Sequence, residues 1–349
     1  MSLEIIALEG TPFEMGGRHG QLLAEGARAM CETRIDLSLR ASGGMSRDRI
    51  LALAGESLPV FEDFAPDAYA EFCGIAEGAG VSREELLIGN GYTDFVDLVR
   101  LQAGPCECTA FGVCPQASSD GALCVGQTWD MNATAFPHVV AFRRTPRTGP
   151  ASVTLTTAGC LSLIGLNEHG IAAGNTNLVP HDARAGVMYL GIIHTALAQT
   201  SFQAALETVI SAPRMSGHFY YLGGPEGELA AVETTGVKHG LIQPEAGLLA
   251  HANHYDDPDL ARYVGQSAPS ENSVGREARM WRLLRDSHAL DMETLWGILG
   301  DHEMPLCRHA ATDADVRTCA AVVMSPARRV IRMGKGNPCE SVPVQVSLA

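Results

Sequence analysis

The sequence predicts a layered α+β domain in which two antiparallel sheets are covered by helices, with a helix-rich segment in front. The first observation is a helical spacing of apolar residues over about 16–87. The second is a change at Cys108, after which short runs rich in Val, Leu and Thr alternate with turn residues. The third is the order of elements after Cys108: strands, helices, strands, helices, strands. Helices covering antiparallel sheets in this order would bury both sets of apolar faces.

The first third of the chain is predicted to be largely helical, because its apolar residues recur three or four positions apart. One such series begins at Leu22 and another at Ile50. After Cys108, antiparallel hairpins are predicted from three turn signals between β-rich runs. These signals are Ser119-Asp120-Gly121, Pro146-Arg147-Thr148-Gly149 and Asn167-Glu168-His169-Gly170.

The second half of the chain adds helices and further strands. A helical stretch is predicted over about 192–211, ending before Pro213. Four strands are then predicted at 218–222, 229–234, 239–242 and 248–252. One or two helices follow over about 275–299, and final strands lie near 320–324 and 330–333. The polar stretch 256–272 is expected to be a loop over the functional site.

Charge and composition exclude several classes of function. The 349 residues carry a formal net charge of −15 without a basic stripe, so neither nucleic acid nor an anionic membrane is an expected partner. The start lacks a cationic and apolar leader, and no run of about 18 apolar residues occurs, so a cytoplasmic protein is expected. The ten cysteines are scattered, and most are expected to be reduced. Oligomeric state stays open.

The step from Glu107 to Cys108 is the most informative place in the chain, because the helix-rich part ends there and the β-rich part begins. If the bond before Cys108 is cut, this residue carries both a thiol nucleophile and a free α-amine that can act as its base. We therefore expect a helix-rich segment 1–107 and a catalytic domain 108–349, packed as one unit. Such a residue predicts amide-bond chemistry by a protein that first processes itself.

Several motifs, taken in order, resemble those of one enzyme family. They are Gly10-Thr11-Pro12-Phe13-Glu14-Met15-Gly16, Cys108-Thr109-Ala110-Phe111, Gly126-Gln127-Thr128-Trp129-Asp130, Gly174-Asn175-Thr176-Asn177, His251-Ala252-Asn253-His254 and Gly334-Lys335-Gly336-Asn337-Pro338-Cys339. Together they span nearly the whole chain, which resembles the penicillin acyltransferase branch of the N-terminal nucleophile hydrolases. The resemblance implies a four-layer αββα sandwich, autocatalytic cleavage before Cys108, and amide hydrolysis or acyl transfer on a small molecule.

Three functions stay open on these residues. The first is hydrolysis of a linear amide through an acyl-thioester on the cysteine. The second is transfer of an acyl group from a thioester, such as acyl-CoA, to an amine. The third belongs to another class, an unprocessed and non-catalytic relative that only binds acylated or peptide ligands. No cofactor is expected, because thiol attack on the preceding carbonyl requires none.

Cys108 is the expected nucleophile. A cysteine thiol has an ordinary pKa of about 8.5 and an α-amine one of about 7.7–8.0, so near neutral pH neither is far from its reactive form. The alternative interpretation of Cys108 is a buried small hydrophobe in a strand. Cys106 competes for the role, but cleavage before it would occur at the carbonyl of Pro105, whose ring restricts the geometry.

Asp130 is the expected partner of the freed amine. A hairpin would place it on the strand beside Cys108, where a carboxylate can hold an ammonium through a charge-assisted hydrogen bond. The alternative interpretation is a solvated aspartate in a turn with Asn132. In the bile salt hydrolase relatives an arginine tends to precede this aspartate by three positions, whereas this chain has Gln127. The departure argues against that branch.

Asn253 is the expected side-chain donor to the oxyanion that forms when an amide carbonyl is attacked. It stands at the end of a predicted strand. A backbone N–H near Asn175 or Asn177 is the expected second donor, and Asn177 matches the family spacing better. The alternative interpretation of each asparagine is the local backbone role that this residue has in turns.

Arg276 resembles a family arginine that supports the site by ion pairing. The alternative interpretation is a solvated helix face, because further arginines recur at three-residue intervals. They are Arg279, Arg282 and Arg285.

Neither a metal site nor a phosphate site is predicted. His251 and His254 are three apart on a predicted strand, so they would lie on opposite faces. Cys307 and His309 would share one face, but no Cys-x-x-Cys or His-Glu-x-x-His motif supports them. The pairs Gly16-Gly17 and Gly223-Gly224 lack the context of a phosphate-binding loop and are expected to permit turns.

Overall fold

The computed structural model describes residues 3–99, 107–264, 270–312 and 315–348. Its N-terminal part is helical, as the apolar spacing predicts. Strand β1 (Ile5–Gly10) is followed by α1 (Pro12–Leu22), α2 (Ala24–Ala41), α3 (Arg47–Gly55), α4 (Leu58–Phe64), α5 (Pro66–Ala79), α6 (Arg83–Asn90) and α7 (Tyr92–Val99). The sequence pattern does not predict β1, because one short apolar run before a helix gives no repeated alternation.

The later strands lie close to where the sequence predicts them. The first hairpin joins β2 (Glu107–Val113) to β3 (Cys124–Asn132), and the 3-10 helix η1 (Ala133–His138) follows it. The remaining strands are β4 (Val139–Pro146), β5 (Ser152–Thr157), β6 (Ile164–Asn167), β7 (Ala172–Asn177), β8 (His218–Gly223), β9 (Leu229–Thr234), β10 (His239–Ile242), β11 (Leu248–His251), β12 (Val316–Ser325), β13 (Val330–Lys335) and β14 (Val344–Ser347). The last strand, β14, is not predicted by the sequence pattern.

The helical stretch expected over 192–211 is two helices, α8 (Tyr189–Leu197) and α9 (Phe202–Ser211). The Asn167 side chain donates hydrogen bonds to the carbonyls of Leu197 and Gln199, at 2.9 and 2.8 Å, and so satisfies the end of α8. Ser201 then caps α9 by accepting a hydrogen bond from the backbone N–H of Ala204. Such side-chain bonds satisfy backbone groups that lack an intrahelical partner, and they separate the two helices.

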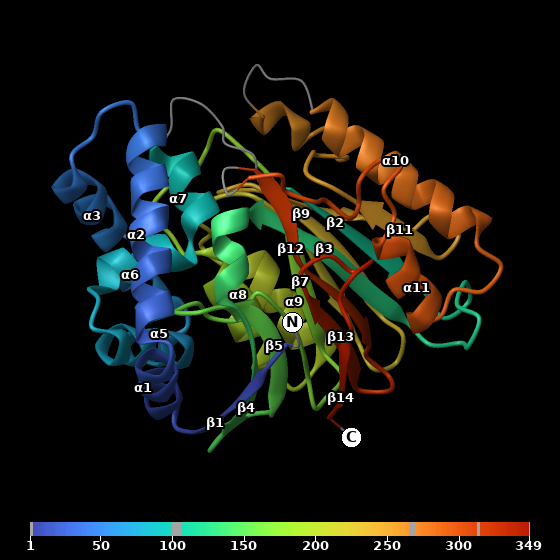
Figure 1. The fold of residues 1–349 in the computed structure, drawn as a ribbon, viewed down its shortest axis with the longest axis horizontal. Coiled ribbons are helices and arrows are strands. Elements are labelled where there is room, and N and C mark those ends of the chain that lie inside the picture. Colours follow the sequence, from blue (N-terminus) through green and yellow to red (C-terminus); the bar gives the residue numbers. More distant parts are fainter. Residues whose placement is uncertain (1–2, 100–106, 265–269, 313–314, 349) are drawn as a thin grey trace.

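Two sheets face each other at the centre of the molecule (Figure 1). The 8-stranded sheet has the order β1-β4-β5-β6-β7-β8-β9-β10, and the 6-stranded sheet has the order β11-β2-β3-β12-β13-β14. Helices α1, α8 and α9 pack on the first sheet, whereas α10 (Glu271–Asp286) and α11 (Met292–Leu299) pack on the second. This arrangement confirms the αββα sandwich. The remaining N-terminal helices lie beside the sandwich, at the left of Figure 1.

The sequence interpretation of Gly16 and Gly17 as turn residues is wrong, because both lie inside α1. A Cβ on Gly16 would collide with the backbone carbonyl of Glu71 in α5, and one on Gly74 would collide with the carbonyl of Phe13. Glycine therefore allows the two helix backbones to approach closely. Gly223 and Gly224 do end β8 at a turn, where the Gly227 N–H donates to the Gly224 carbonyl.

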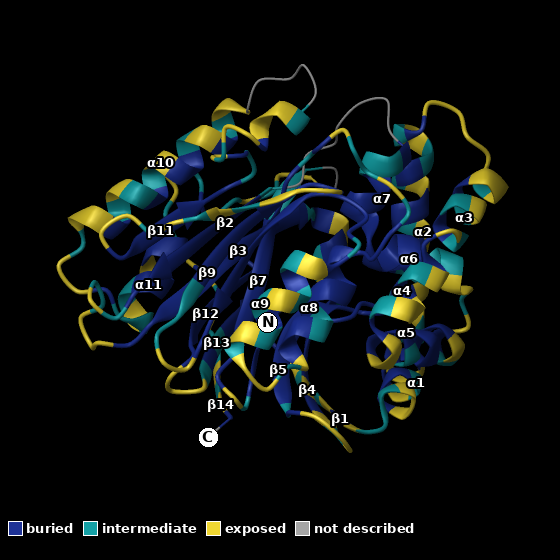
Figure 2. Ribbon diagram, turned by 180° about the vertical axis from the view of Figure 1, so that it is seen from behind, coloured by how far each residue is buried: buried dark blue, intermediate teal, exposed yellow. Residues whose placement is uncertain are grey.

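The main apolar core lies between the two sheets, whose strands are largely buried in Figure 2. On β2, Cys108 and Ala110 belong to this core, whereas Phe111 and Val113 belong to a second cluster beneath α10 and α11. Successive side chains of a strand point to opposite faces, so β2 contributes to two layers at once. Among the described residues, no helix is both long and apolar enough to cross a bilayer.

Candidate active site

Cys108 is the second residue of β2, an interior strand between β11 and β3. This residue is only 6% exposed, and it belongs to the core between the sheets. Directly across the hairpin, Cys108 is paired with Trp129 and Glu107 with Asp130. The bond expected to be cut thus lies at the first step of the strand. Cys106, the competing thiol, is outside the described residues.

Two side chains from other elements hold the backbone of Cys108. Its N–H donates a 2.7 Å hydrogen bond to Oδ1 of Asn253, and its carbonyl accepts one from Nη1 of Arg276. The same nitrogen of Arg276 donates to Oγ1 of Thr109 at 2.7 Å, and Nη2 donates to Oδ1 of Asn253 at 2.9 Å. The Asn253 oxygen therefore accepts from both the Cys108 nitrogen and the arginine.

Arg276 is fully buried in α10 and does not belong to a solvated face. The solvated interpretation holds for Arg282 and Arg285, whose side chains are 54% and 51% exposed. Among the described residues, Arg276 supports the site through hydrogen bonds and not through an ion pair, because its partners are a carbonyl, a hydroxyl and an amide oxygen. Burial lowers the pKa of Arg276, while the nearby Asp130 opposes that shift.

Asp130 lies on β3 and is fully buried, so it is not the solvated turn aspartate of the alternative interpretation. Oδ1 accepts a 2.7 Å hydrogen bond from Oγ1 of Thr318 on β12. Oδ2 has no hydrogen-bond partner among the described residues. Burial raises the pKa of Asp130 to about 7, although the charge of Arg276 and the Thr318 hydroxyl oppose the rise. A buried oxygen without a donor is costly.

Asn253 follows β11 and connects Cys108 to the opposite sheet. Its Nδ2 donates a 2.9 Å hydrogen bond to the carbonyl of Asn177, the last residue of β7. Its backbone N–H donates to Oγ of Ser273 at 2.8 Å. A side-chain amide has two N–H donors, so the bond to Asn177 uses only one of those on Asn253.

Asn175 and Asn177 are both on β7 but differ in their contacts. The N–H of Asn175 donates to Oε1 of Gln127 at 2.9 Å, and its carbonyl accepts from Nε2 of Gln127 at 2.8 Å. Nδ2 of Asn175 contacts Nδ1 of His218 at 3.0 Å. Asn175 therefore joins the two sheets through Gln127, whereas Asn177 is connected to Cys108 through Asn253.

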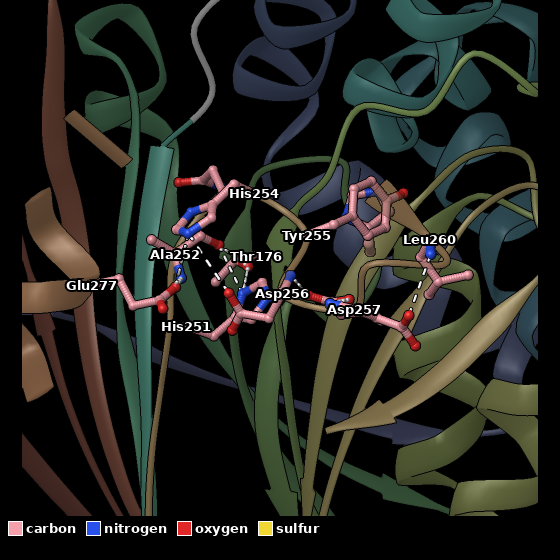
Figure 3. Close-up of polar contacts among 12 residues, drawn as sticks. Thr176, His251, Ala252, His254, Tyr255, Asp256, Asp257, Leu260 and Glu277 are labelled. Carbon is pink, nitrogen blue, oxygen red and sulfur yellow. Dashed lines mark hydrogen bonds and ion pairs between the residues drawn. The ribbon is translucent and has the colours of Figure 1, made fainter. Parts of the chain in front are cut away.

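A network of buried polar side chains holds the segment that carries Asn253 (Figure 3). Nδ1 of His251 lies 3.2 Å from Oγ1 of Thr176, and Nε2 lies 2.9 Å from Oε1 of Glu233. The N–H of Ala252 donates to Oε2 of Glu277 at 3.1 Å. Burial alone would lower the pKa of His251, but its hydrogen bond with Glu233 raises it. This network fixes the backbone on the N-terminal side of Asn253.

His254 extends this network to the C-terminal side of Asn253. Its Nδ1 lies 2.9 Å from Oγ of Ser273, which also accepts the Asn253 N–H. Burial and the charge of His251 lower the pKa of His254 to about 4, whereas burial raises that of Glu277 to about 7. The His251 and His254 rings have centroids 6.4 Å apart, and each has its own hydrogen-bond partner.

Several residues near Cys108 have no sequence signal. Arg308 forms an ion pair with Glu107, which also accepts a 2.8 Å hydrogen bond from Nδ2 of Asn272. Tyr221 is fully buried, and its pKa is raised by burial and by the neighbouring Cys108. Thr318, which bonds Asp130, lies 188 residues away from it in the chain. Such separations leave no spacing pattern to read.

The chain is also similar in sequence to known proteins. The sequence model described as acyl-coenzyme A:6-aminopenicillanic acid acyl-transferase matches residues 117–340. The chain is 26% identical over 315 residues to the acyl-coenzyme A:6-aminopenicillanic-acid-acyltransferase 40 kDa form of Emericella nidulans, covering 87% of this chain and 84% of that protein.

Two solved structures are also similar. A variant of the conjugated bile acid hydrolase from Clostridium perfringens matches with a TM-score of 0.48 and 14% identity, over 69% of this chain and 97% of that one. Penicillin V acylase from Agrobacterium tumefaciens matches with a TM-score of 0.47 and 13% identity, over 69% and 86% respectively.

Proposed function

Because the chain belongs to the acyl-coenzyme A:6-aminopenicillanic acid acyl-transferase family, we propose that Cys108 is the nucleophile of an amide-bond enzyme that first cuts its own chain before this residue. One observation carries the proposal. The Cys108 nitrogen is bonded to Asn253, while the buried carboxylate of Asp130, opposite Glu107, keeps one oxygen without a partner among the described residues. A freed ammonium on Cys108 is the cation that this oxygen lacks.

Maturation would proceed within the chain. The Cys108 thiol adds to the carbonyl carbon of Glu107, the C–N bond breaks, and a proton passes to the nitrogen, which becomes an amine. Water then hydrolyses the resulting thioester and leaves a carboxylate on Glu107 and a free thiol on Cys108. The ion pair of Arg308 with Glu107 and the hydrogen bond of Arg276 to the Cys108 carbonyl fix both sides of the bond.

The products would be segments 1–107 and 108–349, which act as one unit. Strand β1 lies in the first segment and pairs in parallel with β4 of the second, from Ile5 opposite Ala141 to Gly10 opposite Pro146. The tight packing of α1 on α5 keeps the helices of the first segment together. A cut before Cys108 therefore leaves the sandwich intact.

In the mature protein the α-amine of Cys108 takes the thiol proton, directly or through water, and the thiolate attacks an acyl carbon. The developing oxyanion needs preorganised donors. The second Nδ2–H of Asn253 supplies one. The backbone N–H of Asn177 is the better choice for the other, because that of Asn175 is already bonded to Gln127. The amine leaves with a proton, and an acyl-thioester stays on Cys108.

Hydrolysis of this thioester by water makes the protein an amidohydrolase, which is the main proposal. Transfer to an amine is the second candidate, and the name of the Emericella nidulans relative favours it. Both share the acyl-thioester on Cys108, and they differ only in the molecule that accepts the acyl group. Competition between water and added amines for the same acyl-enzyme separates them.

Trapping the acyl-enzyme tests the proposal. The purified protein is mixed with N-acyl amides or acyl-CoA, quenched in acid, and examined by mass spectrometry. We expect one added acyl group on the fragment that begins at Cys108, and its removal by hydroxylamine. Cys114→Ala, on a buried cysteine just beyond the same strand, should still be labelled. Acylation of Cys108→Ala, or turnover without a Cys108 adduct, would refute the role of this thiol.

A further inference from the structure

Four potential metal ligands meet outside the candidate active site, at the loop between α11 and β12. This loop provides His302, Cys307 and His309, and Cys339 comes from the segment after β13. One ligand atom of each lies within 4.8 Å of the others. The sequence pattern argues against a metal here because it contains no Cys-x-x-Cys motif. The structure instead completes the set with a cysteine that lies 30 residues beyond His309.

Four of the six distances between the ligand atoms are close to those around one tetrahedral ion, and all six are within 4.8 Å. The two Sγ atoms are 3.4 Å apart, Nε2 of His309 lies 3.8 Å from Cys307 and 3.4 Å from Cys339, and the two histidine Nε2 atoms are 3.2 Å apart. With Zn–S of about 2.3 Å and Zn–N of about 2.0–2.1 Å, a tetrahedron has S–S, S–N and N–N edges of roughly 3.8, 3.6 and 3.3 Å. We infer that His302, Cys307, His309 and Cys339 bind a single zinc ion.

Neighbouring groups suit this assignment. Nδ2 of Asn337 donates a 3.3 Å hydrogen bond to Sγ of Cys307, and Oε1 of Glu340 lies 3.8 Å from Nδ1 of His309. Donors to thiolate sulfur and carboxylates behind imidazole are the usual outer partners of zinc ligands. Cys307 is buried, whereas His302, His309 and Cys339 are exposed, so the ion can enter from solvent.

The chemistry of the site follows from its ligands. Two thiolates and two imidazoles fill a tetrahedral ion, so no position remains for a reacting water, and the ion is structural. Each thiol must lose its proton to bind. Binding therefore releases two protons per ion from the cysteines near neutral pH, and no redox partner is involved.

The ion would stabilise the loop that supports the candidate cleavage site. Arg308 stands between two ligands and pairs with Glu107 through its side chain. Its backbone N–H donates to Oγ1 of Thr318 at 2.8 Å, and its carbonyl accepts from the Thr318 N–H at 2.9 Å. The Thr318 hydroxyl in turn donates to Asp130. Zinc would thus fix the loop that contacts Glu107 directly and is connected to Asp130 through Thr318.

Metal binding to the whole protein tests this site without any activity assay. Protein kept under reductant is stripped with a chelator and titrated with Co²⁺ and then Zn²⁺. We expect one equivalent of Co²⁺ with the visible and thiolate charge-transfer bands of a tetrahedral sulfur site, displaced by one equivalent of Zn²⁺. Asn337→Ala should weaken Zn²⁺ binding by about 10–100-fold, and Cys307→Ser by more than that.

Controls use the same residue types elsewhere in the chain. His288→Gln, on an exposed histidine after α10, and Cys114→Ser should bind one equivalent as tightly as the parent. Three results would overturn the inference: an octahedral cobalt spectrum, Zn²⁺ binding unchanged in Cys307→Ser and Cys339→Ser, or a Cys307–Cys339 disulfide in reduced, metal-treated protein. The last result would assign the pair of cysteines to redox chemistry instead.

Discussion

Asp130 and Glu71 are both buried carboxylates, yet their surroundings shift their pKa values in opposite directions. Oε1 of Glu71 lies 2.8 Å from Nε of Arg144, and Oε2 lies 3.4 Å from Nε2 of His194. Burial alone would raise the pKa of Glu71, but Arg144 and His194 hold it well below its usual range. Asp130 has one hydroxyl donor, and its pKa is raised to about 7 by burial. Equal burial therefore does not mean an equal role.

Glu71 is a structural carboxylate, whereas we propose that Asp130 gains its partner only after cleavage. Glu71 connects α5 to β4 through its ion pair with Arg144, and its second oxygen lies near His194. Asp130 is paired with Glu107 across the hairpin, and one of its oxygens has no donor within the described part of the chain. A cation that arises only by cleavage, the Cys108 ammonium, would complete it. The following experiments test this contrast.

The largest effect is expected from Glu71→Ala. Removing one partner of a buried ion pair leaves Arg144 buried without its counterion, and such a change costs about 3–5 kcal/mol in the free energy of unfolding. Glu32→Ala serves as the control, since its ion pair with Arg47 is exposed and should cost about 0–1 kcal/mol. Denaturant unfolding gives both values. Equal losses would mean that Glu71 is not the complete, structural carboxylate described here.

Asn253→Ala should reduce turnover on the order of 10²–10³-fold, because one oxyanion donor is lost in a site where such donors dominate. Since Asn253 also holds the Cys108 nitrogen, rates are measured per mole of processed chain. The circular dichroism spectrum should match that of the parent. If the processed variant turns over at a near-normal rate, Asn253 only fixes the end of β11.

The pH dependence of precursor stability should depend on Asp130. In Cys108→Ala, which stays unprocessed, the folded carboxyl has a pKa of about 7 against an ordinary value of about 3.9. The folded state then holds the proton over this window, so stability falls as pH rises from about 4 to 7, by at most about 1.4 kcal/mol per pH unit. Adding Asp130→Asn should remove this slope. Parallel curves for the two proteins would contradict the raised pKa of Asp130 in the folded precursor.

In the processed protein, Asp130→Asn should act on the amine instead. Without the carboxylate the protonated α-amine of Cys108 loses its stabilising charge, so its pKa should fall by about 1 unit or more. The apparent pKa assigned to the amine should move to lower pH in the pH–rate profile, including the alkaline side if the protonated amine is needed there. A profile that superimposes on the parent's, with unchanged turnover, would place Asp130 outside the site.

Periodicity predicted most of the fold, because alternation along a strand and helical spacing are local properties. The strands expected at 229–234 and 239–242 match β9 and β10. Strands β1 and β14 are single short runs, and no adjacent run with the same alternation helps to recognise them. The separation of α8 from α9 depends on Asn167, which is distant in the chain.

The sequence motifs pointed to the candidate site residues that lie within a motif. They did not point to residues that the fold brings in from other parts of the chain. Cys108, Asn253 and Asn177 come from three of the motifs, and the fold connects them by hydrogen bonds; their roles as nucleophile and oxyanion donors stay predictions. The three-residue spacing of arginines on α10 could not reveal that Arg276 turns inward. Thr318 and Arg308 carry no motif, and the contact of Cys339 with His309 joins segments that only the fold brings together. Their roles in catalysis and metal binding stay proposals.

The mass of the purified protein tests the central claim most directly. Held at neutral pH and examined by intact mass spectrometry and N-terminal sequencing, the parent should consist of two polypeptides, one beginning at Cys108. Cys108→Ala should stay a single chain. A fragment that begins at Cys106, equal processing in the alanine variant, or an active chain that is never cut would contradict the account.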